Sequence, residues 1–478
     1  MLIRAPEVPK PAKSAVDAAL ADLERALGSS KVDTSESARH TCARDESEAS
    51  GEIPDCVVHA RTTADVAETL RIAEARGVPV TPRAGGTGRS GGAVPAAGGI
   101  VLDTSTLSRI KDVDPRDMLC VVEPGVVTGD LHAACEAEGL FFPPDPNSWK
   151  SCMIGGNVAE NAGGPRAFKY GSTSRWVLGT ETVLAGGKTL RTGRRTPKGV
   201  TGYDVTSLLV GSEGTLGVFT EVTLRLTRKP QVVGTLLGLH ATARDGAAAV
   251  LDLLATGVVP RCVEMMDAPT LEAVRRQGVG IDPRAGSVLL VELDGDEREV
   301  EAALERAGGA LAASNGSIDV QVAQDAAQRD RLWEARRSLS PATKKLAKYK
   351  LSEDVVVPRT RIADLLDAVA RSAERLAVRH LTYGHAGDGN LHVNFLWDDD
   401  GERERVDRAI AELMKTAVDL GGTLSGEHGI GITKIEYLPL EQSDDLVELQ
   451  LGIKRAFDPR GILNPGKIFA PRRGHGAC

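Results

Sequence analysis

The chain has 478 residues and a formal net charge of −8 at pH 7, and its apolar and charged fractions, 41% and 26%, are those of a globular protein. At roughly 100–200 residues per domain, this length gives two to four structural units with a sizeable core. The negative charge argues against nucleic acid or an anionic membrane as the main partner.

Cysteine spacing and apolar stretches bear on the compartment. The seven cysteines lie too far apart along the chain to form a zinc ribbon or an iron–sulfur motif, so we expect reduced thiols in a reducing compartment. No run of about 18 apolar residues is present, and residues 1–6 lack the apolar core of a signal peptide. We therefore expect a cytoplasmic protein with no transmembrane segment, for which peripheral contact with a membrane stays open.

The first half of the chain alternates helical periodicity with short strands and glycine-rich turns. The first helix ends at Gly28, and the second begins with a cap at Thr62 or Thr63. In chain order the patterns predict helices over residues 13–28 and 63–75 and strands at 57–58, 78–81, 99–102, 180–184 and 217–220.

The character changes after Lys229-Pro230, where longer amphipathic helices alternate with strands, as in an α+β domain. A last helix over 446–456 is followed by an extended strap at 458–469. In between, the patterns predict helices over 246–256, 298–307, 362–377 and 403–420 and strands at 287–293, 319–323 and 393–396.

A glycine-rich loop follows the second predicted strand, over residues 83–92. Gly86, Gly88 and Gly91 have the G-x-G-x-x-G spacing of dinucleotide-binding proteins. A Rossmann site needs a helix that starts at this loop, and Pro95 and the glycines around it disfavour one. Two interpretations remain: a nest of backbone N–H groups that wraps a diphosphate, or a solvent-exposed turn.

Two further glycine-rich clusters lie at residues 143–164 and 210–218. Each alone could be a tight bend, although glycine at this density lets backbone approach a planar ligand closely. Together the three ordered motifs resemble the FAD-binding module of the vanillyl-alcohol-oxidase superfamily, over about residues 50–228. The resemblance implies a two-lobed α+β FAD-binding domain whose first loop cradles the pyrophosphate, while the later clusters line the isoalloxazine and adenosine.

The cofactor-binding residues that this resemblance implies are Arg83, Gly85, Gly86, Thr87, Gly88, Ser90, Gly91, Pro144, Asp145, Gly155, Gly156, Asn157, Gly163, Glu213, Gly217, Val218 and Asn464. Many members of the superfamily tether FAD to a histidine in the first loop. No histidine lies between residues 82 and 95, so we predict non-covalent FAD. Cys152 is a conceivable tether, but a buried, inert thiol is the commoner state of such a residue.

A histidine pair stands in the segment 383–395. Asp388-Gly389 is a preferred two-residue hairpin turn, which would place His385 directly opposite His392 with Cβ atoms about 4.5–5.5 Å apart. Asn394 would share their face of the hairpin. Two imidazoles at this spacing suit a single cation, and the alternative is a polar pair on an exposed sheet face.

An acidic residue and a third histidine, Glu427 and His428, stand between glycines in the segment 421–431. Flanking glycines free the backbone so that neighbouring side chains can point into one site. Two histidines and a glutamate form a nitrogen and oxygen donor set suited to zinc, with manganese or cobalt left open. The alternative is a glycine-rich loop that carries a solvated acid.

These two clusters resemble the C-terminal domain of the FAD-linked oxidases, a family that includes D-lactate dehydrogenase, the D subunit of glycolate oxidase and D-2-hydroxyglutarate dehydrogenase. The motif G-H-A-G-D-G-N-L-H-V-N stands at 384–394, S-G-E-H-G-I-G at 425–431 and N-P-G-K at 464–467. The resemblance implies His385, His392 and Glu427 as metal ligands, His428 as the general base, and Asn394 as a contact to the substrate or to the ligands.

One more segment, Trp333-Glu334-Ala335-Arg336, is similar to a family motif whose arginine binds the substrate carboxylate. The planar guanidinium suits a carboxylate, so Arg336 is assigned this role, against the alternative of an exposed helical arginine. A lysine of the family maps onto either Lys348 or Lys350, of which Lys350 is taken as the site residue.

The domain organisation expected from these resemblances has four parts. Residues 1–50 form a helical segment that packs on the FAD domain, 51–228 the FAD-binding domain, and 229–435 an α+β substrate and metal-binding cap domain with an antiparallel sheet. Residues 436–478 form a helix and a strap that return to the FAD domain.

The activity that the resemblance implies is FAD-dependent, metal-assisted oxidation of a small D-2-hydroxy acid to the 2-keto acid, with D-lactate favoured and D-2-hydroxyglutarate or glycolate as alternatives. The metal would acidify the hydroxyl, His428 would take its proton, and Arg336 would orient the substrate for hydride transfer to the flavin. Two other classes are a zinc hydrolase, which leaves the glycine clusters unexplained, and a non-catalytic flavin-binding subunit.

No haem or iron–sulfur motif is present in the sequence, so the electrons are expected to pass to an external acceptor: a quinone, a cytochrome, an electron-transfer flavoprotein or an iron–sulfur subunit. A homodimer is expected only at the level of the family.

Overall fold

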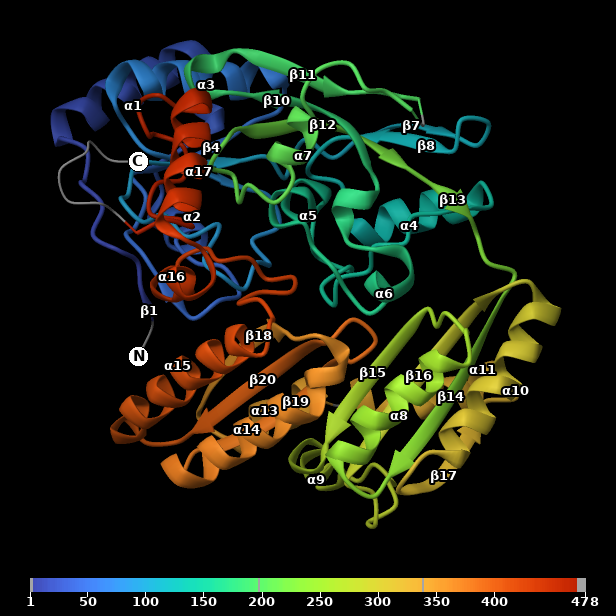
Figure 1. Ribbon diagram of the computed structural model, residues 1–478. Helices are drawn as coiled ribbons and strands as arrows, with labels where there is room; N and C mark the ends of the chain where they lie inside the picture. Colours follow the sequence, from blue (N-terminus) through green and yellow to red (C-terminus); the bar gives the residue numbers. More distant parts are fainter. Residues whose placement is uncertain (1–2, 197, 338, 471–478) are drawn as a thin grey trace. The chain divides into compact units, whose positions relative to one another are not determined.

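The computed structural model describes residues 3–196, 198–337 and 339–470 of the chain, which divides into two compact units (Figure 1). Unit 1 comprises Met1–Gly163, Ser172–Lys229 and Glu427–Cys478, and unit 2 comprises Gly164–Gly171 and Pro230–Gly426. The chain passes from unit 1 to unit 2 after Lys229 and returns to unit 1 at Glu427, and the short segment Gly164–Gly171 also belongs to unit 2.

The first lobe of unit 1 is a four-stranded sheet in the order β2-β4-β6-β5, in which β4, β6 and β5 are parallel. Helices α1 and α3 pack against it through a core that includes Leu23 and Leu70. Helix α3 begins with a capping box between Thr62 and Asp65 and ends at Gly77 in the left-handed region, φ +66°. The bounds are α1 Lys13–Leu27, β2 Val32–Asp33, β4 Cys56–His59, α3 Thr63–Arg76, β5 Val80–Arg83 and β6 Ile100–Asp103.

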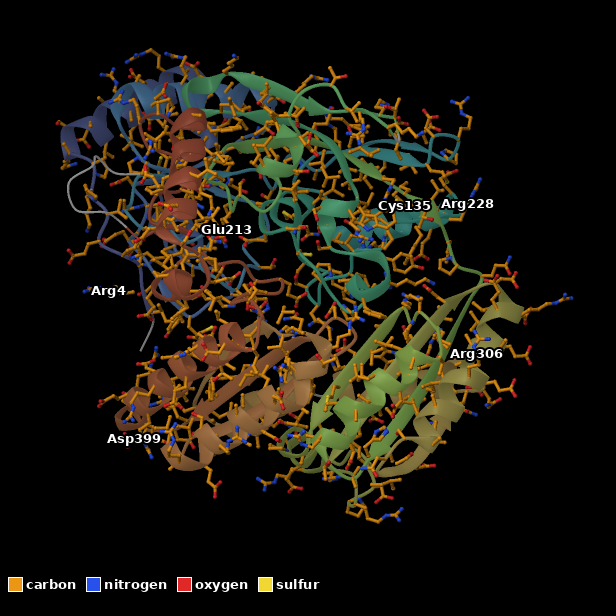
Figure 2. The ribbon with its side chains drawn as sticks, viewed as in Figure 1. Arg4, Cys135, Glu213, Arg228, Arg306 and Asp399 are labelled. Carbon is orange, nitrogen blue, oxygen red and sulfur yellow. The ribbon has the colours of Figure 1, made fainter. Side chains whose placement is uncertain are left out.

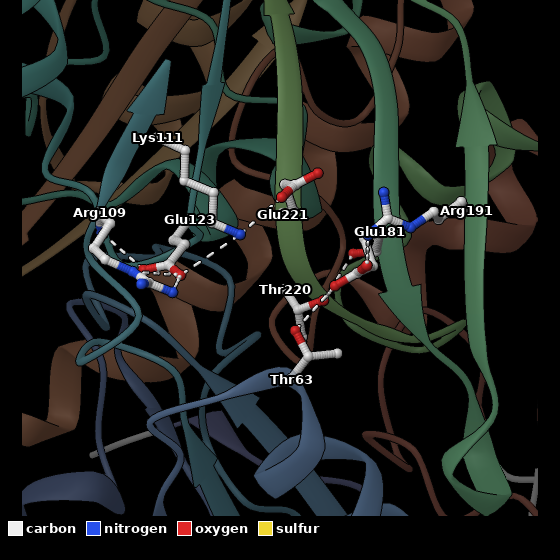
Figure 3. A network of polar contacts seen from close by, with 8 residues as sticks. All are labelled: Thr63, Arg109, Lys111, Glu123, Glu181, Arg191, Thr220 and Glu221. Carbon is white, nitrogen blue, oxygen red and sulfur yellow. Dashed lines mark hydrogen bonds and ion pairs between the residues drawn. The ribbon is translucent and has the colours of Figure 1, made fainter.

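The second lobe is a five-stranded antiparallel sheet in the order β11-β10-β12-β8-β7, and charged side chains cross it (Figure 3). Glu181 is 8% exposed and accepts hydrogen bonds of 2.9 Å from Thr220 of its own sheet and from Thr63, the first residue of α3. This carboxylate therefore ties the two lobes together. The strands are β7 Ile110–Asp114, β8 Leu119–Val122, β10 Val177–Val183, β11 Thr189–Gly193 and β12 Val218–Arg225.

Shorter elements complete unit 1. Strands β1 and β3 form a parallel pair, and β9 pairs with β13. Their bounds, and those of the remaining helices, are β1 Ile3–Arg4, β3 Ala49–Ser50, β9 Leu140–Phe141, β13 Thr227–Arg228, α2 Glu36–Cys42, α4 Thr128–Ala137, α5 Ile154–Glu160, α7 Val205–Leu209, α16 Leu438–Glu441 and α17 Asp444–Phe457.

The chain after α17 runs along the edge of the first lobe. Leu463 forms a parallel bridge with Val80, so the strap lies beside β5 at the edge of the four-stranded sheet. Lys454, 4% exposed, fastens this strap from inside: its Nζ donates to the carbonyls of Thr215 (2.7 Å) and Leu463 (2.9 Å) and forms an ion pair with Asp458.

Unit 2 is built on a seven-stranded sheet in the order β17-β14-β16-β15-β19-β20-β18, and every pairing in it is antiparallel, as predicted for this domain. Its strands are β14 Val232–His240, β15 Cys262–Asp267, β16 Ser287–Gly295, β17 Ser317–Val322, β18 Tyr349–Val356, β19 Arg379–His385 and β20 Asn390–Trp397.

Helices cover both faces of this sheet. Gly246 of α8 meets Met265, Leu311 of α10 meets Gly238, and Phe395 lies among residues of α14 and α15, so these four helices share one face. The opposite face packs on α9, α12 and α13 in a cluster with Met266 and Tyr383. The helices are α6 Ala167–Tyr170, α8 Ala243–Ala255, α9 Ala268–Arg275, α10 Glu297–Ala313, α11 Ala326–Leu332, α12 Glu334–Arg337, α13 Leu339–Leu346, α14 Ile362–Leu376 and α15 Arg403–Asp419.

The seven helices predicted from long periodic segments correspond to α1, α3, α8, α10, α14, α15 and α17. Helix α5 was missed, because its Gly155 and Gly156 have low helix propensity. A Cβ on Gly155 would come within 2.6 Å of the Pro124 side chain, so close packing rather than propensity explains this glycine. The element that follows the loop at 83–92 is strand β6, whereas a Rossmann site needs a helix there.

Two general features of the described residues complete the fold. None of the described helices is both long and apolar enough to cross a bilayer. Six cysteines lie in the described ranges, and each is a buried free thiol; Cys478 lies outside them.

We predict that Lys454→Met destabilises unit 1, because it leaves Asp458 as a buried charge without its counter-ion. Breaking a buried pair in this way costs about 3–5 kcal/mol, which corresponds to a fall of roughly 6–20 °C in the thermal midpoint. Scanning calorimetry of the purified protein measures the shift. The control is Lys13→Met, which removes an ion pair whose side chains are 87% and 56% exposed and should unfold with the wild type; equal midpoints for the two variants would contradict the prediction.

Candidate functional site

The histidine pair lies on adjacent strands, but its register differs from the prediction. His385 pairs with Asn390 and Tyr383 with His392, so the two histidines are diagonal neighbours rather than directly opposed. The connection is the four residues 386–389, and not a two-residue turn at Asp388-Gly389.

Hydrogen bonds to the neighbouring strands explain this longer loop. The N–H of Gly387 donates to Val263 of β15, and the carbonyl of Gly389 accepts from Val357, just beyond β18. Gly389 has φ +85°, and a Cβ there would lie 2.0 Å from the Val357 carbonyl oxygen, so only glycine fits. Tertiary contacts therefore draw these residues out of the two-residue turn that their sequence favours.

The register differs by two residues, an even number, so the face of each side chain is unchanged. The imidazoles of His385 and His392 lie on the same face with their ring centroids 5.3 Å apart and their planes at 87°. Both residues are buried, at 2% and 4% exposure. The structure thus brings the pair together although the predicted pairing was wrong.

Glu427 joins the pair through the segment that precedes it. The N–H of Gly426 donates to Asp354 of β18 at 2.7 Å, and the Ser425 hydroxyl donates to the same carboxylate at 3.1 Å. Glu427 is bonded directly to Gly426, so its position follows from this attachment to the sheet. Ligand atoms of His385, His392 and Glu427 all lie within 4.8 Å of one another.

This donor set fits a divalent cation. Zinc held tetrahedrally, with nitrogen at about 2.0–2.1 Å, keeps its ligand atoms about 3.4 Å apart, so a shift of about 1 Å would close the cluster around an ion. Two imidazoles and one carboxylate also leave a coordination position for a further ligand. The three residues predicted as metal ligands therefore form one cluster with suitable chemistry.

A fourth buried side chain, Glu264 of β15, was missed by the sequence analysis. Its Oε1 is hydrogen-bonded to Nδ1 of His385, and its Oε2 accepts a 2.6 Å hydrogen bond from Nε of Arg336. Burial raises the pKa of Glu264, but the neighbouring His385 and Arg336 outweigh this and hold it well below its ordinary range. A single acid within an apolar strand carries no motif, and only the pairing of β15 with β19 shows its role.

Arg336 reaches this face from helix α12. Its guanidinium carbon lies 5.0 Å from the centroid of the Tyr383 ring, and its side chain is 10% exposed. Trp333, three residues earlier, donates from Nε1 to Glu292 of β16 at 2.7 Å. The Trp-x-x-Arg motif is thus fastened to the sheet by two acids, and the alternative of an exposed arginine is excluded.

The other residues predicted for substrate contact take different positions. Asn394 is fully buried, and its amide donates to the carbonyls of His392 (3.0 Å) and Leu381 (3.3 Å).

Lys350 is paired with Leu396, which places it on the face that carries His392. Lys348 precedes β18 and is exposed, with its Nζ over the Tyr349 ring. His428 is 16% exposed, and its Nε2 lies 4.0 Å from Glu427.

In unit 1 the three glycine-rich clusters meet. A Cβ on Gly85 would lie 3.0 Å from the Ser151 carbonyl oxygen, so the first and second clusters touch. Glu213 of the third cluster, shown in Figure 2, accepts hydrogen bonds from the N–H groups of Ile430 (2.8 Å) and Gly431 (2.7 Å). Asn464 donates to the carbonyls of Gly92 and Glu213 and so closes the ring of segments.

Buried polar atoms around these segments fit a polar cofactor such as FAD. Five of them have no hydrogen-bond partner among the described residues: Asp45 Oδ2, Ser90 Oγ, Glu160 Oε2, Ser212 Oγ and Asn464 Oδ1. Burial of such atoms costs free energy unless a ligand or a water molecule forms hydrogen bonds with them. Ser90 and Asn464 were predicted from the sequence, whereas Asp45, Glu160 and Ser212 were not.

Burial also changes the acidities in this region. It raises the pKa of Glu160 well above its ordinary value, and the nearby Glu213 carboxylate adds to the rise. It lowers the pKa of Lys467, whose Nζ donates to the Val94 carbonyl, to about 8. Asp45, Glu160, Glu213 and Lys467 are thus buried around the glycine loop, and burial shifts the pKa of each group in the direction that favours its neutral form.

Some predicted cofactor residues have structural partners instead. Asn157 donates to Thr128 at 2.6 Å, and the Pro144 carbonyl is hydrogen-bonded to His132 at 2.9 Å. Val218 belongs to the apolar core of the first lobe. A Cβ on Gly217 would lie 2.5 Å from the Thr182 side chain, so its lack of a side chain is explained by packing.

Comparisons with known proteins identify the family. The family of FAD-linked oxidases, C-terminal domain, matches residues 229–468, and the FAD binding domain family matches residues 54–193. The chain belongs to the FAD-linked oxidase family. It is an FAD-linked oxidoreductase, and a zinc hydrolase is no longer a competing class.

Relatives of known name cover most of the chain. The glycolate oxidase subunit GlcD of Bacillus subtilis is 41% identical over 87% of this chain and 89% of its own length. The D-lactate dehydrogenase of Archaeoglobus fulgidus is 36% identical over 86% and 90%, and that of Anaerostipes hadrus 34% over 87% and 89%.

Solved structures show the same fold at lower identity. The 4-ethylphenol oxidase of Gulosibacter chungangensis has a TM-score of 0.79 at 18% identity, over 98% of this chain and 99% of its own. p-Cresol methylhydroxylase has a TM-score of 0.81 at 16% identity, over 97% and 98%. The fold expected from the glycine motifs, that of the vanillyl-alcohol oxidases, is confirmed.

We predict that the wild-type protein binds a divalent metal and that His385→Ala does not. This variant should keep FAD, because the glycine clusters belong to unit 1 and the histidine to unit 2. Elemental analysis after dialysis and the visible flavin absorbance are the two measurements. The matched control is His380→Ala, on the opposite face of the same strand, which should keep the metal. Stoichiometric metal in the His385 variant would remove this residue from the ligand set.

Proposed function

We propose that this protein is an FAD-dependent, metal-assisted dehydrogenase that oxidises a short D-2-hydroxy acid to the 2-keto acid. The observation that supports it most is the cluster of His385, His392 and Glu427, with Arg336 held next to it by Glu264. A cation and a guanidinium side by side match the two polar ends of a 2-hydroxy acid, its hydroxyl and its carboxylate.

When bound, FAD supplies the hydride acceptor, and a divalent cation supplies Lewis acidity toward the hydroxyl. The residues that would hold FAD are those of the glycine clusters in unit 1, without a covalent tether. The metal would be held by His385, His392 and Glu427, with zinc favoured by the donor set and manganese as the alternative.

The chain's own residues would bind and orient the substrate. Arg336 would take the carboxylate on its terminal nitrogens, because its Nε is already bonded to Glu264. The Tyr383 ring below the guanidinium keeps its plane fixed. A fixed carboxylate leaves the substrate few orientations, and this restriction is worth several orders of magnitude in rate when the reacting atoms are aligned.

Proton transfer is assigned to His428. It follows the ligand Glu427 directly in the chain, so its imidazole stands next to the metal cluster, where the hydroxyl would be bound. Histidine is the side chain whose ordinary acidity suits a general base near neutral pH. Asn394 would support the His392 ligand through its bond to that residue's carbonyl.

The substrate class follows from the site and from the names of the relatives. One arginine serves one carboxylate, and the named relatives act as a glycolate oxidase subunit and as D-lactate dehydrogenases. We therefore propose D-lactate as the first substrate and glycolate as the second candidate, which the 41% identical relative favours. Lys350, on the ligand-bearing face, is the residue to test for a second carboxylate, as in D-2-hydroxyglutarate.

The electrons would pass to an external acceptor. The name of the B. subtilis relative describes it as a subunit, so a partner subunit is one acceptor to test, beside a quinone, a cytochrome and an electron-transfer flavoprotein. A homodimer, a cytoplasmic location and peripheral contact with a membrane stay predictions.

Anaerobic addition of D-lactate or glycolate to the purified yellow protein should bleach the flavin absorbance, and an artificial dye acceptor should restore it. A panel of D- and L-2-hydroxy acids, which includes D-2-hydroxyglutarate, ranks the substrates by kcat/KM. We expect the D-acids with one carboxylate to rank first. If no 2-hydroxy acid bleaches the flavin, the proposed function is wrong.

His428→Ala should remain a folded protein that carries flavin and metal, with kcat lowered at least about 100-fold, because the hydroxyl proton loses its acceptor. Stopped-flow reduction of the flavin measures this step directly. Asn394→Asp is the comparison, since it alters a buried support of His392 and should change metal binding rather than proton transfer. Near-normal turnover of the His428 variant would remove this residue from the role of base.

A further inference from the structure

One carboxylate connects two residues that the proposed function assigns to different tasks. Glu264 bonds through one oxygen to His385, a metal ligand, and through the other to Arg336, the carboxylate-binding residue. Its side chain is fully buried, at 0% exposure, while that of Arg336 is 10% exposed and that of His385 2%. No solvent therefore competes for either bond.

The sheet fixes this carboxylate in place. Glu264 lies in the middle of β15, directly opposite His385 on β19 and Leu290 on β16. Directly opposed residues have Cβ atoms about 4.5–5.5 Å apart and share a face, so the glutamate must lie beside the imidazole. Its chain neighbours Val263 and Met265 are buried apolar residues on the other face.

A charge in such a strand is not explained by stability alone. An apolar side chain at a buried strand position is usually as stable as an ion pair, or more so, because the pair must be desolvated. Glu264 is nevertheless buried with two cationic partners, one from α12 and one from β19. This arrangement indicates a role in orienting those partners.

The bond to Nδ1 decides which nitrogen of His385 can face the cluster. A carboxylate accepts and cannot donate, so it holds the proton on Nδ1 and leaves the lone pair on Nε2, the atom that would bind a metal. The bond to Nε of Arg336 likewise fixes the plane of the guanidinium. Rotation of either group away from the site would leave the glutamate as a buried, incompletely paired charge.

We propose that Glu264 is a positioning residue that sets the tautomer of His385 and the plane of Arg336 together, and so links metal affinity to recognition of the substrate carboxylate. This inference rests on the proposed function for the meaning of the two partners. It assigns Glu264 no contact with substrate, cofactor or metal.

Glu264→Gln is the direct test, because glutamine has the same shape but only one accepting oxygen. If that oxygen bonds to Arg336, the amide N–H₂ faces His385 and favours the tautomer with the proton on Nε2, the wrong one for a metal ligand. We expect the dissociation constant for Zn²⁺, measured by chelator competition on the flavin-loaded protein without substrate, to rise about 10–100-fold.

The link to substrate is measured in a mutant cycle with Arg336→Met at saturating metal. Glu264→Gln alone should raise KM for the hydroxy acid more than it lowers kcat. In the Arg336→Met background the same change should raise KM no further, because the guanidinium that it orients is gone. Additive KM effects in the cycle would contradict the orienting role toward Arg336.

A matched control lies on the same face of the sheet. Glu292 of β16 is also buried, at 8% exposure, and it accepts a hydrogen bond from Trp333 of the Trp-x-x-Arg motif. The described hydrogen bonds from His385 and Arg336 to a carboxylate go to Glu264 and not to Glu292. Glu292→Gln should leave the dissociation constant for Zn²⁺ within about twofold of the wild type. Equal weakening by the two variants would show a merely structural effect and overturn the proposal.

A second variant at the same position tests the proposal if Glu264→Gln does not fold. Glu264→Asp keeps the charge but is one methylene shorter, so it can reach only one of the two partners. We expect either the metal affinity to fall or KM to rise by at least about tenfold. Wild-type values for both would overturn the proposal. Because metal affinity is measured without substrate, an enzyme that oxidises no 2-hydroxy acid refutes the proposed function alone.

Discussion

A buried carboxylate must be neutralised where it lies, and the site of unit 2 is arranged around that requirement. Glu264 occupies the centre of a strand, without access to solvent, and its two oxygens are bonded to His385 and Arg336. The histidine comes from the adjacent strand and the arginine from a helix on the same face. Their positions relative to each other thus follow from one acid, and the second acid, Glu292, holds the same helical segment through Trp333.

The antiparallel sheet supplies the second constraint. Side chains alternate with a period of two, so any even displacement of β19 against β20 keeps both imidazoles on the face that carries Glu264. The opposite face of the sheet is covered by α8, α10, α14 and α15. Side chains on a strand pair within a seven-stranded sheet are held more firmly than side chains on a loop, which suits the proposed cation site.

Unit 1 has a different feature, a buried region lined by backbone and polar atoms that suits a large polar ligand. Its glycine clusters approach each other at backbone distance, and Glu213 and Asn464 bond these segments to one another. Several polar atoms around them have no partner among the described residues. The same strap that carries Asn464 is fastened by Lys454, so the stability of unit 1 and the shape of its cofactor region depend on the same C-terminal residues.

Local periodicity in the sequence determined the long helices. Short, ordered motifs that resemble those of known proteins indicated the family, the flavin-binding segments and the candidate ligands His385, His392 and Glu427. The sequence also determined that both histidines share a face, since that depends on parity alone. Only the tertiary structure decided the hairpin register, because Gly387 and Gly389 bond to strands β15 and β18 that are distant in sequence. For the same reason Glu264, Asp45 and Glu160 have no local signal in the sequence. Each of these acids interacts with a residue more than 40 positions away, and no pattern within one strand or helix predicts such a contact.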